Sequence, residues 1–280
     1  MTGIFRDDDL TRLLLPGIPA DYLGTPVLDE ENKTLLARRD VMFEILGDRI
    51  PLPTTEAREG YFGERHLEYW LSGRRDAGKV MTATAVSHTA PRILDFGGAS
   101  GRVIRHFRRQ WPEAELYLSD LNPVHVALSR HLFGGDVRAF HNTGLPSLPF
   151  PDGYLDCVMA FSVFTHIDHD DTAWLMELRR VLKPSGHLYI TVHDQATWDV
   201  LPRTVIGTLS MANEDFHDYH IRHPELTGRK VHVYSTTSDT YNCNVFVGMD
   251  YIERHWAPLF SGYSLVSLAH DHQAGLVFHM

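Results

Sequence analysis

Residues Asp95 to Gly101 read Asp-Phe-Gly-Gly-Ala-Ser-Gly and have the composition of a ligand-binding turn. They follow an apolar segment that favours a buried strand, and they precede a segment that favours a helix. Glycine lets a ligand press against bare backbone, because it lacks a Cβ and adopts positive φ without strain. The first N–H groups of the helix can also face a ligand. With the carboxylate of Asp95, this turn suits a ligand that carries a cationic amino group and a carboxylate.

This turn resembles the first motif of the class I S-adenosylmethionine-dependent methyltransferases, in which an acid precedes three alternating glycines. Gly97 and Gly101 match the first and last glycine, Gly98 stands beside the middle position, and Ala99 occupies it. Because alanine avoids the left-handed region, we expect a negative φ at Ala99. The dinucleotide fingerprint Gly-x-Gly-x-x-Gly does not fit this spacing. The resemblance implies S-adenosylmethionine as the cofactor and methyl transfer as the reaction.

A second stretch, Phe150-Pro-Asp-Gly followed by Ser-Val-Phe-Thr-His166, resembles the "LPFPDGSFDVV…SVFTH" stretch of the same family. The resemblance implies that Phe161 and Ser162 face the sulfonium region and that His166 lies near the departing methyl group. With an ordinary pKa of about 6.5, His166 suits a general base, and a structural or cofactor-shell role is the alternative. His193 follows the fifth predicted strand and could touch the substrate, because ligands sit beyond the carboxyl ends of parallel strands.

Polar residues also end the second and third predicted strands. The resemblance implies that Asp120 accepts the ribose hydroxyls, with Leu121 beside it, and an N-cap or turn role before the following proline is the alternative. Asn142 and Thr143 correspond to the residues that contact adenine in the family. The alternative there is a turn built on Asn-x-Gly.

The segments that must position these residues alternate between strand and helix patterns. This alternation predicts an α/β fold with a doubly wound, seven-stranded, mostly parallel sheet, helices on both faces and an antiparallel C-terminal strand pair. The predicted strands are 92–96, 115–119, 137–141, 155–161, 187–193, 264–269 and 275–279. The predicted helices are 30–46, 56–80, 102–110, 123–131, 169–182 and 249–259, with a weaker one near Leu145. A turn at 182–186 and a hairpin connection at 271–275 complete the pattern.

We expect an N-terminal helical arm or lid at 1–80 and a methyltransferase domain at 81–280, with a substrate segment inserted after the fifth strand at 195–248. Aromatic and histidine side chains can orient an amine, bind a carboxylate or accept a phenol proton. The candidates for the substrate site are Tyr61, Tyr234, Tyr241, Asn242 and His255.

Composition limits the partners. The net charge is −10 and basic runs are short, so nucleic acid is not expected as a substrate. Two cysteines, Cys157 and Cys243, make neither a disulfide framework nor a four-ligand zinc site. Acids at 168, 170 and 171 fit the first turn of a helix better than a metal site. With no apolar run of membrane-spanning length and no signal peptide, we expect a cytoplasmic enzyme without a membrane partner, and self-association is left open.

The predicted function is methyl transfer from S-adenosylmethionine to an oxygen or nitrogen atom of a small molecule. Sulfur in a thiol or thioether, such as a sulfur amino acid, is the alternative acceptor, and it needs no base. Two rival functions remain open, a catalytically silent S-adenosylmethionine-binding protein and an NAD-dependent oxidoreductase. The glycine spacing disfavours the second of these.

Overall fold

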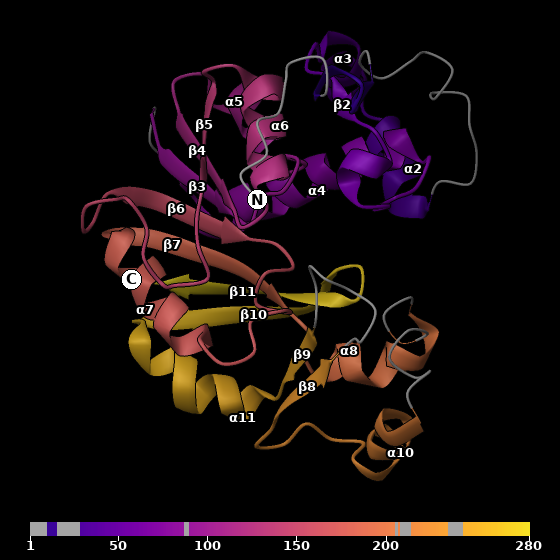
Figure 1. The fold of residues 1–280 in the computed structure, drawn as a ribbon, viewed down its shortest axis with the longest axis vertical. Helices are drawn as coiled ribbons and strands as arrows, with labels where there is room; N and C mark the ends of the chain where they lie inside the picture. The colour runs from indigo at the N-terminus through magenta and orange to yellow at the C-terminus, as the bar shows by residue number, and fades with distance from the viewer. Residues whose placement is uncertain (1–9, 16–28, 87–89, 205–206, 208–213, 235–242) are drawn as a thin grey trace. The chain divides into compact units, whose positions relative to one another are not determined.

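The computed structural model describes residues 10–15, 29–86, 90–204, 207, 214–234 and 243–280 (Figure 1). The chain forms two compact units, one of residues 1–82 with 87–142 and the other of residues 83–86 with 143–280. Tyr241 and Asn242, which were predicted to line the substrate site, lie outside the described residues.

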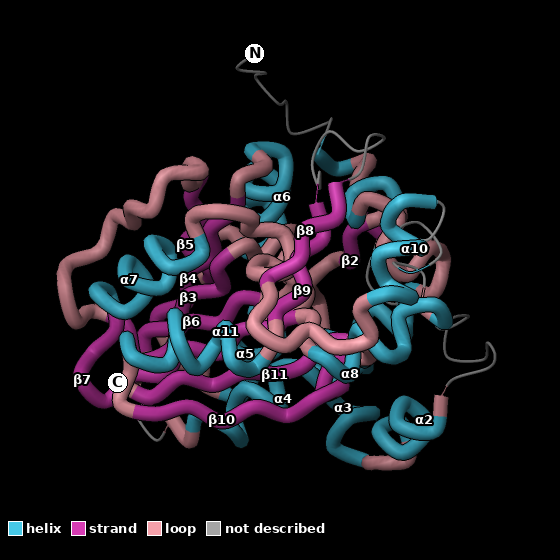
Figure 2. The backbone as a smooth tube through the Cα atoms, turned by 90° about the horizontal axis from the view of Figure 1, so that it is seen from below, coloured by secondary structure: helices cyan, strands magenta, loops and turns pink. Residues whose placement is uncertain are grey.

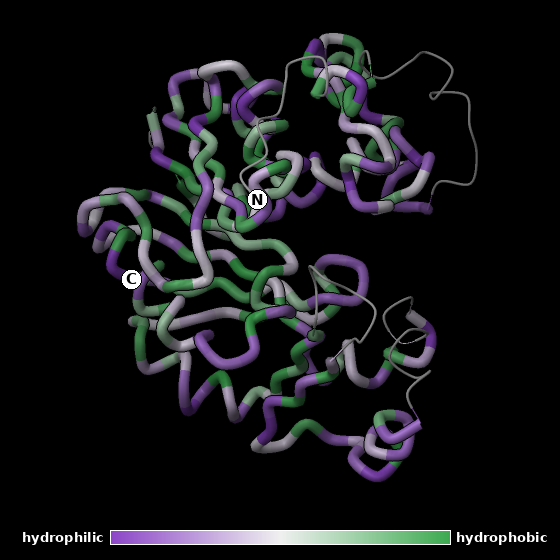
Figure 3. Tube along the Cα trace, viewed as in Figure 1, coloured by the Kyte–Doolittle hydropathy of each residue, from purple (hydrophilic) through white to green (hydrophobic). Residues whose placement is uncertain are grey.

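Seven strands form one mostly parallel sheet in the order β10-β11-β7-β6-β3-β4-β5, which confirms the predicted fold class. Neighbouring strands are parallel within each unit except at the C-terminal hairpin, where β11 is antiparallel to both β7 and β10. Every residue of β6 is buried, and hydrophobic residues predominate along it (Figure 3). The strands are β3 (Arg92–Phe96), β4 (Glu115–Asp120), β5 (Val137–His141), β6 (Leu155–Ala160), β7 (Leu182–Val192), β10 (Gly262–His270) and β11 (Gln273–His279).

Helices connect β3 to β4, β4 to β5 and β6 to β7, as parallel crossovers usually do, whereas a loop leads from β5 to β6 (Figure 2). In α6 (Pro123–Phe133), the side chain of Asn122 caps the first turn by accepting from the Val124 N–H, and proline occupies the first helical position. The helix ends at Gly134, whose φ of +61° is one that glycine tolerates well. The other two crossover helices are α5 (Ile104–Gln110) and α7 (Asp171–Val181).

The single helix predicted at 30–46 is two helices, α2 (Glu30–Leu36) and α3 (Arg39–Gly47). On one straight helix Leu36 and Val41 would point about 140° apart, at about 100° per residue. The break between the helices lets both side chains join one hydrophobic cluster. That cluster also holds residues of the short strand β2 (Leu52–Pro53), which pairs with β1 (Leu14–Leu15), and of α4 (His66–Thr84). Its buried members are Val41, Ile45, Leu52, Leu67, Tyr69, Trp70 and Leu71.

The segment after β7 has a hydrophobic cluster of its own, built on Trp198, Leu201, Phe216, Leu226, Val233 and Phe246. Its elements are α8 (Gln195–Val200), α10 (Glu214–Arg222) and the antiparallel pair β8 (Lys230–Tyr234) and β9 (Cys243–Val247). The helix predicted at 249–259 begins with α11 (Met249–Tyr251) and continues through a π-helical turn and a 3₁₀ turn to Leu259.

Three local predictions are wrong. The region of Leu145 has no helix, and its side chain is exposed next to Pro146. The predicted turn at 182–186 belongs to β7, where a register shift between Leu155 and Cys157 of β6 accommodates the irregular residues. The hairpin connection is only two residues long, because His270 already pairs with Gln273.

The acids at the start of α7 interact with a lysine of this chain. Asp171 is buried, its Oδ1 lies 2.9 Å from Lys230 Nζ, and its Oδ2 accepts a 2.7 Å hydrogen bond from Trp256 Nε1. Lys230 also donates to the Asp168 carbonyl. Lys230 of β8 therefore supplies the positive charge that balances Asp171, and this pair connects α7 to β8.

Replacing Lys230 by methionine is expected to lower the free energy of unfolding by about 3 kcal/mol, because it leaves a buried carboxylate without its counter-charge. Urea denaturation measures this loss. Lys183→Met is the matched control, since Lys183 pairs with the buried Asp156 but is itself one-third exposed. Equal losses in the two variants would show that burial of Lys230 does not increase the contribution of its ion pair to the free energy of unfolding.

Within the described residues, no helix is long and apolar enough to cross a membrane.

Candidate active site

The glycine turn between β3 and α5 is closely packed. Gly97 and Gly101 have φ values of +71° and +75°, a region open to glycine. A Cβ on Gly98 would lie 2.8 Å from both Asp95 Cγ and Leu118 Cδ1, so only glycine fits there without displacing its neighbours. The turn therefore requires glycine at Gly97 and Gly101 because of their positive φ, and at Gly98 because a side chain would not fit.

The expectation of a negative φ at Ala99 is wrong, because its φ is +46°. Two hydrogen bonds hold this residue in the left-handed region. Its N–H donates to Asp120 Oδ2 at 2.8 Å, and its carbonyl accepts from Ser129 Oγ at 3.0 Å. The left-handed conformation costs alanine about 1–2 kcal/mol, which these two bonds offset.

Ala99→Gly is expected to raise the free energy of unfolding by about 0.5–1 kcal/mol, because relief of the positive φ outweighs the greater freedom of glycine in the unfolded chain. A gain of about 2 °C in the unfolding temperature would follow. Calorimetry of the ligand-free protein measures it. Ala114→Gly, at a position with no positive φ, should instead lose stability, and a loss in both variants would contradict the argument.

Asp120, at the end of β4, organises the same turn. Besides the bond from Ala99, its Oδ1 accepts from the Asn122 N–H at 2.8 Å. Asn122, and not Asp120, caps α6, so the N-cap alternative does not apply to this acid. Each carboxylate oxygen has two acceptor sites, so Asp120 can still accept from a ligand. Burial lowers the pKa of His125, but the carboxylate of Asp120, 3.6 Å from its Nδ1, and the charge of Glu59 outweigh it and raise the pKa overall.

Asp95 is buried at the end of β3, and its Oδ2 has no hydrogen-bond partner among the described residues. Burial raises the pKa of this carboxyl to about 7, although the positive charge of Arg102 opposes the shift. A buried acid with an oxygen lacking a partner is costly unless a ligand completes it. A cationic ligand group would both supply the hydrogen bond and favour the ionised form.

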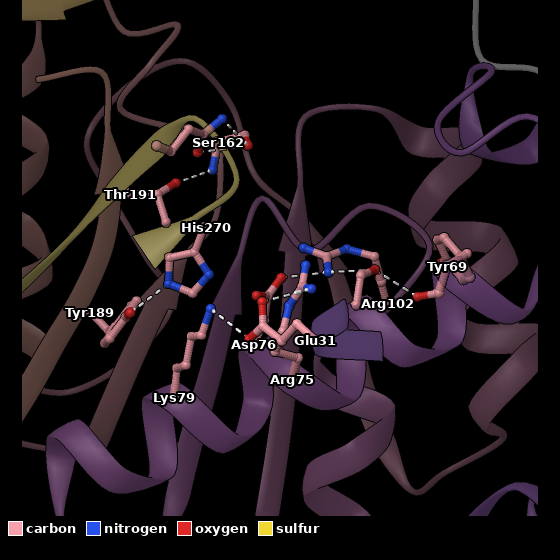
Figure 4. Close-up of polar contacts among 12 residues, drawn as sticks. Glu31, Tyr69, Arg75, Asp76, Lys79, Arg102, Ser162, Tyr189, Thr191 and His270 are labelled. Carbon is pink, nitrogen blue, oxygen red and sulfur yellow. Dashed lines mark hydrogen bonds and ion pairs between the residues drawn. The ribbon is translucent and has the colours of Figure 1, made fainter. Parts of the chain in front are cut away.

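Arg102 was not among the residues predicted from the sequence. Its Nη1 donates to Asp76 Oδ2 at 2.6 Å (Figure 4). It also donates to Ser72 Oγ at 3.1 Å, and Ser72 and Asp76 are four residues apart on α4. The guanidinium also lies 5.7 Å from the centre of the Tyr61 ring. α4 approaches closely because a Cβ on Gly73 would lie 2.1 Å from the Arg102 carbonyl oxygen. Two sequence features could have indicated Arg102. It is a basic residue directly after the last glycine, and Ser72 and Asp76 have the spacing of neighbours on one helix face.

In the second unit, the end of β6 leads to His166. The His166 Nδ1 lies 2.6 Å from the Cys243 carbonyl oxygen, and the Cys243 thiol donates to the His166 carbonyl at 3.2 Å. A carbonyl oxygen only accepts, so Nδ1 carries the proton and Nε2 is the basic nitrogen of the neutral ring. Burial lowers the pKa of His166, partly offset by the Cys243 hydrogen bond, and keeps the ring neutral at physiological pH.

His193, at the end of β7, is fully buried, and neither ring nitrogen makes a hydrogen bond of normal geometry within the described residues. Its ring stacks on Phe246 at 5.0 Å and on His272 at 5.7 Å. Burial, together with the neighbouring rings of His272 and His166, lowers its pKa to about 3. His166 and His193 thus belong to one group of neutral imidazoles.

The other predicted site residues fall into two sets. In the first unit, Asn142 is buried beside β4, its N–H donating to the Asp120 carbonyl at 3.2 Å, while Leu121 is exposed. In the second unit, Thr143 accepts from the Leu145 N–H, and Phe161 is partly buried.

Of the substrate-site candidates, Tyr234 donates to Asp168 Oδ2 at 3.1 Å, and exposed His255 packs on Tyr251. The contacts of these two candidates are thus with Asp168 and Tyr251, respectively.

Comparisons with known proteins agree with this geometry. A family model described as a methyltransferase domain matches residues 60–239. A ubiquinone/menaquinone biosynthesis C-methyltransferase from Bordetella avium is 36% identical over 102 residues, covering 35% of this chain and 40% of that protein. Its counterpart from Paraburkholderia xenovorans is 32% identical over 138 residues, covering 48% and 56%. The chain spans about half the length of these relatives.

A solved structure of a SAM-dependent methyltransferase from Methanosarcina mazei has a TM-score of 0.50 and 15% identity, covering 70% of this chain and 94% of that one, and it shows the fold alone. The family match covers well over half of the chain and includes the glycine turn and His166. The chain therefore belongs to the methyltransferase domain family, that of the class I S-adenosylmethionine-dependent methyltransferases.

Proposed function

We propose that this enzyme methylates a small molecule at an atom that carries a proton, and that His166 accepts that proton. The observation that supports this most directly is the 2.6 Å contact between His166 Nδ1 and the Cys243 carbonyl oxygen. It orients the ring and makes Nε2 the proton-accepting atom, which is the arrangement that general-base catalysis requires. His193, a buried ring whose nitrogens make no hydrogen bond of normal geometry with the described residues, is proposed to bind a polar group of the acceptor.

The residues of the glycine turn fit the amino-acid end of the cofactor. We propose that the ammonium group binds Asp95, whose Oδ2 lacks a partner among the described residues, and that the carboxylate binds near Arg102. Ser72 and Asp76 hold Arg102 in place for this. Asp120 is proposed to accept the ribose hydroxyls, Asn142 and Thr143 to contact adenine, and Phe161 to line the sulfonium region. Leu121 and Tyr61 remain proposals for the cofactor and substrate sites.

S-adenosylmethionine supplies a methyl group that is already activated on a sulfonium. The chain's own residues must align the acceptor atom with that methyl group, a contribution worth up to about 7–11 kcal/mol in model reactions. They must also remove the acceptor's proton where it has one. Sulfur acceptors have no such need, so dependence on His166 distinguishes the proposed acceptors from a thioether.

The acceptor atom is proposed to be oxygen, nitrogen or a ring carbon. Carbon was not among the atoms predicted from the sequence, and it enters because the relatives named above are called C-methyltransferases. All three kinds of atom carry a proton that must leave, so all agree with a neutral, oriented His166. The net charge of −10 supports a small molecule over a nucleic acid.

Calorimetric titration with S-adenosylhomocysteine, with NAD as the control ligand, tests the cofactor site. Micromolar binding of the first alone is expected. Incubation with S-adenosylmethionine and a panel of phenols, amines, quinols and thiols then tests the acceptor, read as the mass gain of one CH₂ group. Cofactor binding with no product from any proton-bearing acceptor would contradict the proposal and favour a sulfur acceptor or a silent binding protein.

A further inference from the structure

The C-terminal hairpin bends sharply around His270. Leu268 and Asp271, on either side of it, have φ values of +52° and +59°, which are costly for residues other than glycine. The register of β10 against β11 also shifts between Val266 and His270. Bulges of this kind commonly redirect a side chain next to a functional site. The residue that is redirected here is His270.

The His270 ring is bonded to β7. Its Nε2 lies 2.5 Å from the Tyr189 hydroxyl oxygen, and both residues are buried (Figure 4). A Cβ on Gly275 would lie 2.5 Å from that hydroxyl oxygen, so the absence of a side chain at Gly275 makes room for the bond. The bulge, the glycine and the tyrosine thus support one buried hydrogen bond.

Tyr189 and His270 both pack against Phe161, the residue that follows β6. The Phe161 ring stacks on Tyr189 with the centres 5.7 Å apart, and it meets the His270 ring edge-on at 5.0 Å. Phe161 is therefore held on two sides by rings that also hold each other. Such packing restricts its rotamer in a way that one contact would not.

The next residue, Ser162, is held by the same hairpin. Its φ is +55°, and its N–H donates to Thr191 Oγ1 at 2.7 Å. The Gln273 amide faces the Ser162 hydroxyl, with Nε2 to Oγ at 2.9 Å and Oε1 to Oγ at 3.2 Å. An unfavourable backbone conformation persists only where its surroundings maintain it, and it is commonest at functional sites.

We infer that His270 and Gln273 are positioning residues that hold Phe161 and Ser162 in the geometry that binds the cofactor. The C-terminal hairpin would then act on cofactor affinity through two independent contacts on one dipeptide. The inference rests on the proposed role of Phe161 in cofactor binding. It adds two residues that neither the motifs nor the family match indicate, since both lie beyond residue 239.

Titration of the full chain with S-adenosylhomocysteine tests the inference. His270→Phe keeps the ring and removes the bond to Tyr189, and Tyr189→Phe removes it from the other side. Each is expected to weaken binding about tenfold, and the double variant should lose no more than either single variant, because one interaction is removed each time. His270→Gln keeps a polar atom near the Nε2 position and should restore most of the affinity.

His279→Phe is the matched control. It makes the same substitution on the same hairpin, at the end where His279 contacts His187, and it should leave affinity unchanged. The unfolding temperature of each ligand-free variant separates positioning from loss of fold. Phe161→Ala tests the underlying role of Phe161.

The outcomes are distinct. If the wild-type chain does not bind S-adenosylhomocysteine, the cofactor site itself is wrong. If the wild type binds it but His270→Phe stays within twofold, or loses affinity no more than His279→Phe does, the inference is overturned while the enzyme assignment stands. Additive losses in the double variant would also overturn it, and so would an unchanged affinity in Phe161→Ala.

Discussion

Asp95→Asn is expected to bind S-adenosylhomocysteine about 100-fold more weakly than the wild type, because a charged hydrogen bond worth about 3 kcal/mol is lost. The same variant should be the more stable protein without ligand at pH 8. The reason is that the buried carboxyl of Asp95, with an oxygen that lacks a partner among the described residues, is costly to ionise. Lower affinity together with higher stability of the ligand-free protein is the result expected if Asp95 destabilises the empty site and binds the ligand in the filled one.

The pH dependence has a definite sign. The pKa of Asp95 is about 7 in the folded chain, against an ordinary value of 3.8. The folded state therefore binds more protons between these values, and stability falls as pH rises from about 4 to about 7, by an amount on the order of 4 kcal/mol at most. Asp95→Asn removes this penalty, so its advantage should be a few kcal/mol at pH 8 and small at pH 4.

Cofactor affinity should follow the opposite course. An ammonium group favours the ionised form of Asp95, so binding releases a proton wherever Asp95 is protonated beforehand. The affinity of the wild type should therefore rise about tenfold per pH unit below pH 7 and level off above it. Calorimetry from pH 5.5 to 7.5 measures this slope, and Asp95→Asn should remove it.

Asp156→Asn serves as the control, because Asp156 is also buried but belongs to the second unit, where it is ion-paired with Lys183. Its affinity for S-adenosylhomocysteine should match the wild type. An Asp95→Asn variant with wild-type affinity and the wild-type slope would show that Asp95 does not contact the cofactor.

His166→Ala is expected to reduce kcat by about 10²–10⁴-fold on a proton-bearing acceptor, while the affinity for S-adenosylhomocysteine changes little. The base works only when neutral. Because burial lowers the pKa of His166, activity should decline with falling pH only below the ordinary histidine value of about 6.5. The wild-type profile of kcat/KM against pH measures this decline at low pH, and the variant should not show it.

His217→Ala, which removes an exposed ring from α10 of the same unit, should keep wild-type kcat. If His166→Ala also kept it, no base would be needed at this position, and a sulfur acceptor would become the better explanation. A loss of cofactor affinity equal to the loss of kcat would instead assign His166 to the cofactor shell.

Local sequence determined much of this protein. The strands at 92–96 and 137–141 have the predicted bounds, because a largely buried segment at 92–96 and an alternation of buried and exposed residues at 137–141 each lie between turn-forming residues. The glycine turn was recognisable for a similar reason, since the lack of a Cβ at Gly97, Gly98 and Gly101 is a property of the residues themselves. These features depend on neighbours in the chain, so the sequence alone could indicate the fold and the cofactor.

The tertiary structure decided what depends on residues far apart in the chain. Ala99 adopts positive φ because Asp120 and Ser129 bind its backbone, and no local pattern could show that. Arg102 is held by α4 some 26–30 residues earlier, and Phe161 lies against a ring from the C-terminal hairpin. A side chain's direction and its electrostatic surroundings arise only when distant segments pack together. The sequence could therefore indicate which residues to consider, and folding determined how they are held.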